Sequence, residues 1–165
     1  TGVQTCALPI SAHRRHVQER VDALVGVGGR VVSPTVTPDR PGNWFAPTLV
    51  DGLDPSATVD EIFGPVASVH RYRDVDEALA IANGTDYGLE AYVVGGDSDR
   101  AMEVGRLVRA GGVKVNGVLP MSLNIMAPRP AFGISGLHDE GTVETIRFFG
   151  GNRVVGVENS LGAGN

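Results

Sequence analysis

The segment Glu90–Asn116, EAYVVGGDSDRAMEVGRLVRAGGVKVN, decides the fold class of this chain. Its two ends, Glu90–Gly95 and Gly112–Asn116, are short apolar runs bounded by glycine, which is typical of strands. Between them, Asp97–Arg109 carries apolar residues at helical spacing. The residues expected to face inward are Ala101, Val104, Leu107 and Val108. A strand, a helix and a second strand in this order predict a right-handed crossover between neighbouring parallel strands.

The chain before this segment shows the same alternation of helices and strands. A helix is expected from Ser11, which is a candidate N-cap, to the glycines at Gly26–Gly29, which act as a C-cap. Its apolar stripe consists of Val17, Val21, Leu24 and Val25. Strands are expected at 30–33, 44–50 and 66–72, the last buried on at least one side. Asp74 and Glu77 have capping-box spacing, which predicts a helix that ends near Asn83.

After Asn116 the pattern predicts a long loop over 117–139, a helix over 141–149 and a terminal strand over 152–158. The last residues, SLGAGN, are expected to fray. The fold class is therefore α/β, with a mostly parallel sheet and crossover helices.

Composition excludes several classes of protein. The 165 residues suffice for about one domain, and the formal net charge of −5 argues against a nucleic-acid partner. The longest apolar runs fall well short of the ~18 residues that a membrane helix needs, so no membrane partner is expected. A single cysteine, Cys6, excludes an internal disulfide and favours a reducing, cytoplasmic compartment.

The first ten residues, TGVQTCALPI, are unlike the rest of the chain because they carry no charge and no amphipathic period. The decapeptide resembles the in-frame translation of a common sequencing-adapter oligonucleotide. We therefore expect residues 1–10 to be an adapter-derived artefact and the native sequence to start near Ser11. The alternative is an ordinary flexible N-terminus.

Several residue patterns suggest chemistry that their context makes unfavourable. The glycines at Gly26–Gly29 follow a helix and precede a strand, which is the reverse of a phosphate-binding loop. Lys114 is the only lysine, and its position in a strand predicts a solvated or snorkelling side chain rather than a Schiff base. His13 and His16 share a helical face but have no third metal ligand, and His70 is expected to be a satisfied strand histidine.

A serine hydrolase is a further alternative. Ser135 lies close to His138 and Asp139, but catalytic triads are assembled from distant segments. Ser135 and Gly136 are more simply turn residues.

The segment Asp60–Val66, DEIFGPV, differs from these because it sets a carboxylate and an aromatic ring two residues apart before a Gly-Pro stop. In an extended chain, Glu61 and Phe63 project to the same side. A carboxylate can accept two ribose hydroxyls, and a flat ring can pack on a sugar or a nicotinamide. A loop acid beside a core phenylalanine is the alternative.

These residues resemble the NAD(P)-dependent aldehyde dehydrogenase family. The motifs that carry the resemblance occur in the order of that family, and they are FAPTLV at 45–50, EIFGPV at 61–66, IANGTDYGL at 81–89, GVKVN at 112–116, FGISG at 132–136 and EG at 140–141. The similarity extends from Ser11 to Glu158. The FGISG segment is two to three residues shorter than is usual in the family, which puts the loop beside the substrate tunnel in doubt.

The resemblance implies the C-terminal part of an aldehyde dehydrogenase-like fold. Residues 11–135 would belong to the catalytic domain, 136–150 to a helix that returns to the cofactor domain, 151–158 to an oligomerisation arm strand, and 159–165 to a frayed tail. It also implies that Glu61 binds the nicotinamide ribose hydroxyls of NAD or NADP, that Phe63 packs beside that ribose, and that Asn116 borders the substrate tunnel. A small aldehyde and a homo-oligomer would be the partners of the intact enzyme.

The family reaction is attack of a cysteine thiolate on the aldehyde, hydride transfer to NAD(P)+ and hydrolysis of the thioester. The nucleophile, the general base and the oxyanion donor precede the segment that matches Ser11, and the surroundings of Cys6 do not match the nucleophile motif. The resemblance therefore implies that this chain is inactive alone and contains no catalytic residue. The alternative is a non-catalytic interaction or dimerisation module.

Overall fold

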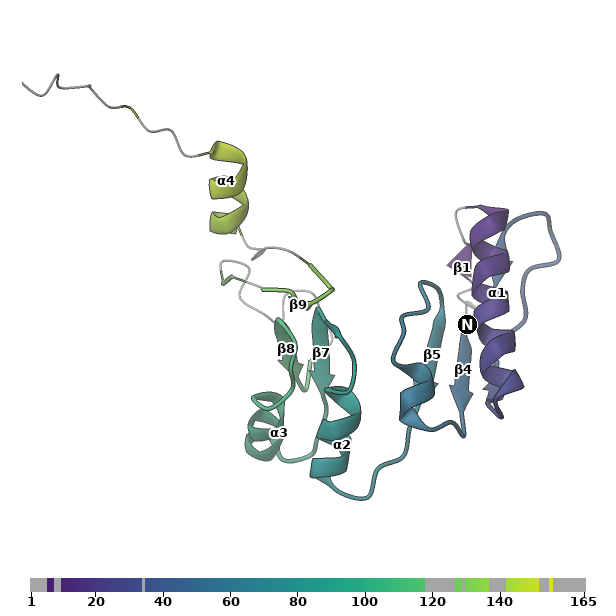
Figure 1. Cartoon of the computed structure of the whole chain (residues 1–165), viewed down its shortest axis with the longest axis horizontal. Helices are drawn as coiled ribbons and strands as arrows, with labels where there is room; N and C mark the ends of the chain where they lie inside the picture. The colour runs from purple at the N-terminus through teal and green to yellow at the C-terminus, as the bar shows by residue number, and fades with distance from the viewer. Residues whose placement is uncertain are drawn as a thin grey trace, which may run out of the picture. The chain divides into compact units, whose positions relative to one another are not determined.

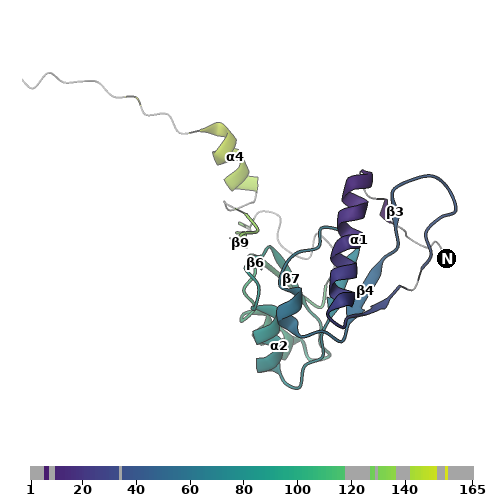
Figure 2. The ribbon, with the colours of Figure 1, turned by 45° about the vertical axis from the view of Figure 1, so that its right-hand side comes forward.

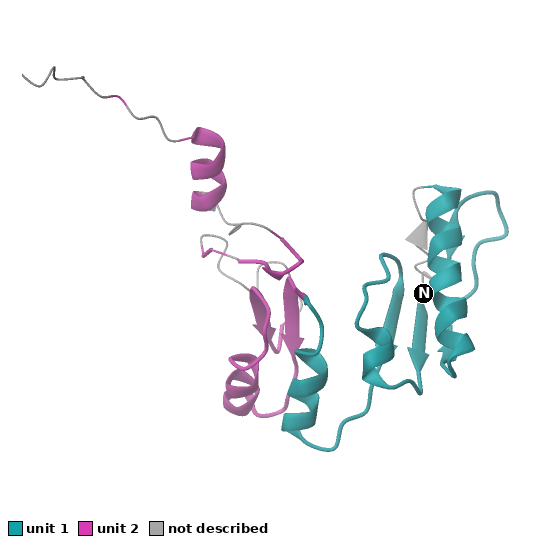
Figure 3. Ribbon diagram, in the orientation of Figure 1, with its two compact units in different colours: residues 1–86 teal, residues 87–165 magenta. Residues whose placement is uncertain are grey.

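The computed structural model describes residues 6–7, 10–33, 35–117, 127–128, 130–136, 142–151 and 155. The chain forms two compact units, Thr1–Asp86 and Tyr87–Asn165 (Figure 3).

The first unit is built on a three-stranded sheet with the order β2-β4-β5. β4 (Thr48–Asp51) lies in the centre, parallel to β5 (Val66–Val69) and antiparallel to β2 (Arg30–Val32). α1 (Ser11–Gly26) lies alongside β4 (Figures 1 and 2). A separate two-stranded pairing joins β1 (Cys6–Ala7) to β3 (Trp44–Phe45) in antiparallel register, so the expected strand over 44–50 is broken in two.

The core of this unit lies between α1, β3 and the chain that enters β5. Val17, Val21 and Phe45 are buried together, and Ile62 and Val66 pack against them. Two of the four predicted stripe residues are therefore buried, but Val25 is 47% exposed and does not face the core. β5 ends at Val69 rather than at residue 72 and is half-buried only at Val66, so the expectation of a strand buried on at least one side is wrong.

The ends of α1 agree only in part with the sequence analysis. Ile10, in an extended conformation, is the N-cap, and none of the described side chains caps the helix. Ser11 is instead the first helical residue. The C-terminal end is as predicted, because Gly28 adopts a φ of 102° and its amide donates to the carbonyl of Val25.

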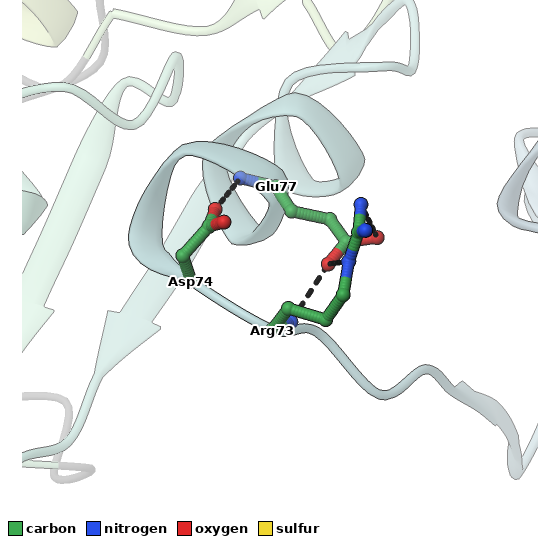
Figure 4. A network of polar contacts seen from close by, with 3 residues as sticks. All are labelled: Arg73, Asp74 and Glu77. Carbon is green, nitrogen blue, oxygen red and sulfur yellow. Dashed lines mark hydrogen bonds and ion pairs between the residues drawn. The ribbon is translucent and has the colours of Figure 1, made fainter.

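α2 (Val75–Ala82) begins where the capping box predicts. The Asp74 carboxylate accepts a hydrogen bond from the Glu77 amide at 2.9 Å, and the Glu77 carboxylate accepts from the amide of Arg73 at 2.7 Å (Figure 4). The helix ends at Asn83, also as predicted. A short 3-10 helix, η1 (Pro55–Thr58), precedes β5 and is capped by Asp54.

The second unit contains the predicted order of strand, helix and parallel strand. β7 (Glu90–Val93) and β8 (Gly112–Val115) are parallel, and α3 (Ser98–Gly105) connects them (Figure 1). α3 packs on the strands through Gly105, at which an added Cβ would lie 3.2 Å from Val115.

α3 ends four residues before the predicted Arg109. Beyond Gly105 the amides of Leu107 and Val108 donate to carbonyls three residues back, which is the pattern of a tightened turn. Leu107 is 61% exposed, so its predicted inward orientation is wrong, whereas Ala101 is buried as predicted.

The remaining elements of this unit are short. β6 (Tyr87–Gly88) pairs antiparallel with β9 (Phe132–Gly133), and α4 (Thr142–Gly150) confirms the helix expected over 141–149. Apart from residue 155, the expected strand over 152–158 lies outside the described residues, as does the tail over 159–165. No helix in the described ranges is long and apolar enough to cross a bilayer.

The α/β class is confirmed, but a mostly parallel sheet is not. The described strands are divided among four small sheets, and only β4–β5 and β7–β8 are parallel. Parallel neighbours require a long crossover, whereas the described residues between β2 and β4 form no helix and β4 returns antiparallel to β2.

Candidate functional site

The segment Asp60–Pro65 leaves a carboxylate and a ring open to solvent on the first unit. Ile62 is half-buried and packs against the core, while its neighbours Glu61 and Phe63 are exposed, Phe63 by 73%. This is the alternation expected of an extended chain with one side chain in and two out. The alternative, that Phe63 is a core residue, is therefore wrong.

One face of α1 holds this segment in place. The His13 ring donates from Nε2 to the carbonyl of Phe63, and its centroid lies 6.0 Å from that of the Phe63 ring. Two turns further along α1, Arg20 Nη2 lies 3.5 Å from Asp60 Oδ2. The segment is thus tied to α1 on both sides of Glu61, through the side chain of Asp60 and the carbonyl of Phe63.

Gly64 brings the segment into direct contact with this helix. A Cβ on Gly64 would lie 2.9 Å from Cγ2 and 3.1 Å from Cγ1 of Val17, which is fully buried. The close approach therefore requires a residue without a side chain. His13, Val17 and Arg20 have the i, i+4, i+7 spacing of one helical face, and all three contact the segment between Asp60 and Gly64.

This arrangement can bind a polyhydroxylated ligand with a flat group. An exposed carboxylate has two oxygens that can accept hydroxyl hydrogens. An exposed ring next to it offers a face and an edge for packing. Because the backbone between them is anchored, both groups are presented at little cost in conformational entropy.

The sequence analysis identified Glu61 and Phe63 but not the residues that position them. In the sequence, His13 forms with His16 only an incomplete pair of metal ligands, and no motif singles out Arg20. The helical spacing of His13, Val17 and Arg20 was present in the sequence, but nothing in it indicated which segment they would contact. The described residues contain no group of three His, Cys, Asp or Glu side chains that could hold a metal ion.

Asn116, the third predicted site residue, belongs to the second unit. It follows β8 with a φ of 50°, a left-handed conformation that asparagine tolerates better than most residues. Its Oδ1 accepts from the Gly95 amide at 2.8 Å, and its Nδ2 donates to Ser98 Oγ at 3.0 Å. The amide thereby ties the end of β8 to the end of β7 and the start of α3.

Two other residues considered in the sequence have structural partners. Ser135 Oγ accepts from the Gly88 amide at 2.9 Å, which supports a turn residue rather than a nucleophile, while His138 and Asp139 lie outside the described residues. His70 Nε2 lies 2.9 Å from Thr58 Oγ1, as expected of a satisfied histidine.

Lys114 is not solvated as predicted. Its side chain is only 5% exposed, and Nζ lies 2.6 Å from a carboxylate oxygen of Glu90 and 3.4 Å from the hydroxyl of Tyr92, its register partner on β7. The hydrogen bond to Glu90 raises the pKa of the ammonium, outweighing the opposite effect of desolvation. A lysine held charged in this way is a poor nucleophile.

Comparison with known proteins gives a consistent result. The model of the aldehyde dehydrogenase family matches residues 1–155. The chain is 38% identical over 112 residues to succinate-semialdehyde dehydrogenase [NADP(+)] of Deinococcus radiodurans, covering 66% of this chain and 24% of that protein. It is 35% identical over 138 residues to geranial dehydrogenase of Castellaniella defragrans, covering 82% and 28%.

Solved structures give the same result. Aldehyde dehydrogenase C of Pseudomonas syringae, a mutant complexed with NAD+ and octanal, matches with a TM-score of 0.74 and 33% identity over 84% of this chain and 29% of that one. An NAD-dependent aldehyde dehydrogenase from Sinorhizobium meliloti matches with a TM-score of 0.74 and 31% identity over 84% and 28%. The chain thus spans about a quarter of the length of the relatives it matches.

Proposed function

The chain belongs to the aldehyde dehydrogenase family, and from this premise we propose that it is the C-terminal part of a longer enzyme that oxidises an aldehyde to a carboxylic acid with NAD+ or NADP+. The short span of the match within each relative supports a longer polypeptide. A relative named for NADP(+) and another solved with NAD+ and octanal support the substrate and cofactor classes.

The cofactor contacts that we assign to this chain are Glu61 and Phe63. Glu61 would accept hydrogen bonds from the nicotinamide ribose hydroxyls, and Phe63 would pack beside that ribose. The bound dinucleotide would supply the hydride acceptor. The observation that carries this proposal is the exposure of both side chains on a segment anchored to α1 by His13 and Arg20.

The remaining assignments concern the intact enzyme. Asn116 would border the substrate tunnel by setting the direction of the chain that leaves β8, since its amide groups are engaged by Gly95 and Ser98. The enzyme would act as a homo-oligomer in the cytoplasm. The 165-residue chain alone would be inactive, because Cys6 does not have the surroundings of the family nucleophile.

The decisive experiment is to read the coding sequence upstream of Ser11 and to express the complete polypeptide. We expect an in-frame continuation with a cysteine motif and, in the purified enzyme, aldehyde-dependent formation of NADH or NADPH measured by absorbance. The 165-residue chain should give no such signal. A start codon near Ser11, or a full-length protein that leaves all aldehydes unoxidised, would refute the proposal and favour the interaction module.

A further inference from the structure

An open cavity of about 510 Å³ lies at the carboxyl ends of the two parallel strands of the first unit. Its wall includes Leu53, just after β4, and His70 and Arg71, just after β5. Arg30 on β2 and Ile81 on α2 also line it. The carboxyl ends of neighbouring parallel strands are where α/β sheets most often bind ligands. The Glu61–Phe63 segment precedes β5 and so lies at the other end of that strand.

Both carboxylates that line the cavity are already neutralised. Asp51 accepts two hydrogen bonds from the Arg30 guanidinium, and these bonds hold the pKa of the Asp51 carboxyl below its ordinary value. Glu77 accepts from the amide and the guanidinium of Arg73 (Figure 4), which likewise lowers the pKa of the Glu77 carboxyl. Both acids therefore remain ionised and paired near neutral pH.

Arg71 also lines the cavity but belongs to neither of these ion pairs. Within the described part of the chain, its guanidinium makes no hydrogen bond or ion pair, and it acts on Asp51 only at longer range. Among the described residues, the cavity wall therefore presents one guanidinium that has no hydrogen-bonded carboxylate partner. A guanidinium offers a planar pair of donors that matches the two oxygens of a carboxylate.

The rest of the wall is largely apolar. Leu53, Val69 and Ile81 line the cavity, and Val69 is 45% exposed. We propose that this cavity binds a short aliphatic monocarboxylate, whose carboxylate pairs with Arg71 and whose chain packs on Leu53, Val69 and Ile81. A carboxylate is also the product class of the proposed oxidation, but the inference stands on the cavity alone.

The test is a titration of the ¹⁵N-labelled 165-residue chain with hexanoate, followed by amide chemical shifts. We expect saturable shifts at Leu53, Val69–Arg71 and Ile81. Arg71→Gln should weaken the affinity about tenfold or more, the scale of a lost charged hydrogen bond, and Arg71→Lys should weaken it less. Arg15→Gln, an equal change of charge at an exposed position on α1, should leave the affinity unchanged.

Two further ligands test the apolar contacts and the charge requirement separately in the unmodified chain. Inorganic phosphate, which lacks an apolar body, should bind more weakly than hexanoate, and hexylamine, which has the wrong charge, should cause no shifts at these amides. The proposal is overturned by the absence of saturable shifts with hexanoate, by equal binding of phosphate or hexylamine, or by equal losses in the Arg71→Gln and Arg15→Gln variants.

Discussion

Val17 connects the stability of the first unit to the geometry of the candidate site. It is fully buried on α1, packs with Val21 and Phe45, and forms the surface against which Gly64 lies. Truncation to alanine should therefore reduce the free energy of unfolding and loosen the segment that presents Phe63. Val25, on the same helix, is 47% exposed and is the matched control.

The magnitude follows from what the substitution removes. Two buried carbon atoms contribute about 1.6 kcal/mol at ~0.8 kcal/mol each. The void left under Gly64 adds a cavity cost, because a packed interior relaxes only in part. We expect Val17→Ala to destabilise the chain by roughly 2–3 kcal/mol and Val25→Ala by less than about 0.5 kcal/mol, as is usual for surface positions.

Urea denaturation monitored by circular dichroism measures both values. Val17→Ala should lower the midpoint while leaving the slope nearly unchanged. In the same variant, the nuclear Overhauser contacts between the rings of Phe63 and His13, whose centroids lie 6.0 Å apart, should weaken. Equal midpoints for Val17→Ala and Val25→Ala would refute the packing described here.

Three further predictions concern other parts of the first unit. Asp74→Ala removes the N-cap of α2 and should cost about 1 kcal/mol in urea unfolding, whereas Asp76→Ala, in the first turn of the same helix but not at the cap, should cost less; equal effects would argue against the cap. The hydrogen bonds from Arg30 lower the pKa of the Asp51 carboxyl in the folded state, so this ion pair stabilises the fold fully above the unfolded carboxyl pKa of about 3.9 and stops doing so as the pH falls through the lower folded pKa. Arg30→Gln should therefore reduce the fall of the urea midpoint below about pH 4. An unchanged dependence of the midpoint on pH would contradict this. In the complete polypeptide, Glu61→Gln should weaken cofactor binding by roughly 1–3 kcal/mol, and an unchanged Kd and turnover would remove Glu61 from the cofactor site.

Caps, glycine stops and the order of helices and strands were predicted reliably where they depend on residues close together in the sequence. The capping box at Asp74, the glycine stop after α1 and the strand-helix-strand order around α3 were confirmed, because each involves hydrogen bonds or packing within a short stretch of chain. Element ends were less reliable. Ser11 has the side chain of an N-cap, yet Ile10 occupies that position, and α3 ends at Gly105 rather than Arg109.

The burial of side chains depended on contacts that the sequence does not contain. Leu107 has the spacing of an inward residue but follows the end of α3 and is exposed. Lys114 is charged and yet buried, because the β7–β8 register sets it beside Glu90 and Tyr92. A helical or strand period predicts which residues share a face, but not whether another element covers it.

The order of motifs along the chain was enough to determine the family, the α/β class and the pair Glu61 and Phe63 as the residues to examine. Only the tertiary structure decided that His13 and Arg20 hold that segment, that Val17 lies against Gly64, and that Arg71, at the end of β5, has no hydrogen-bonded partner among the described residues. The physical reason is the separation along the chain. Periodicity, caps and turns are set by residues a few positions apart, whereas these contacts join residues about 40 to 50 positions apart, and they exist only once α1 has packed on its sheet.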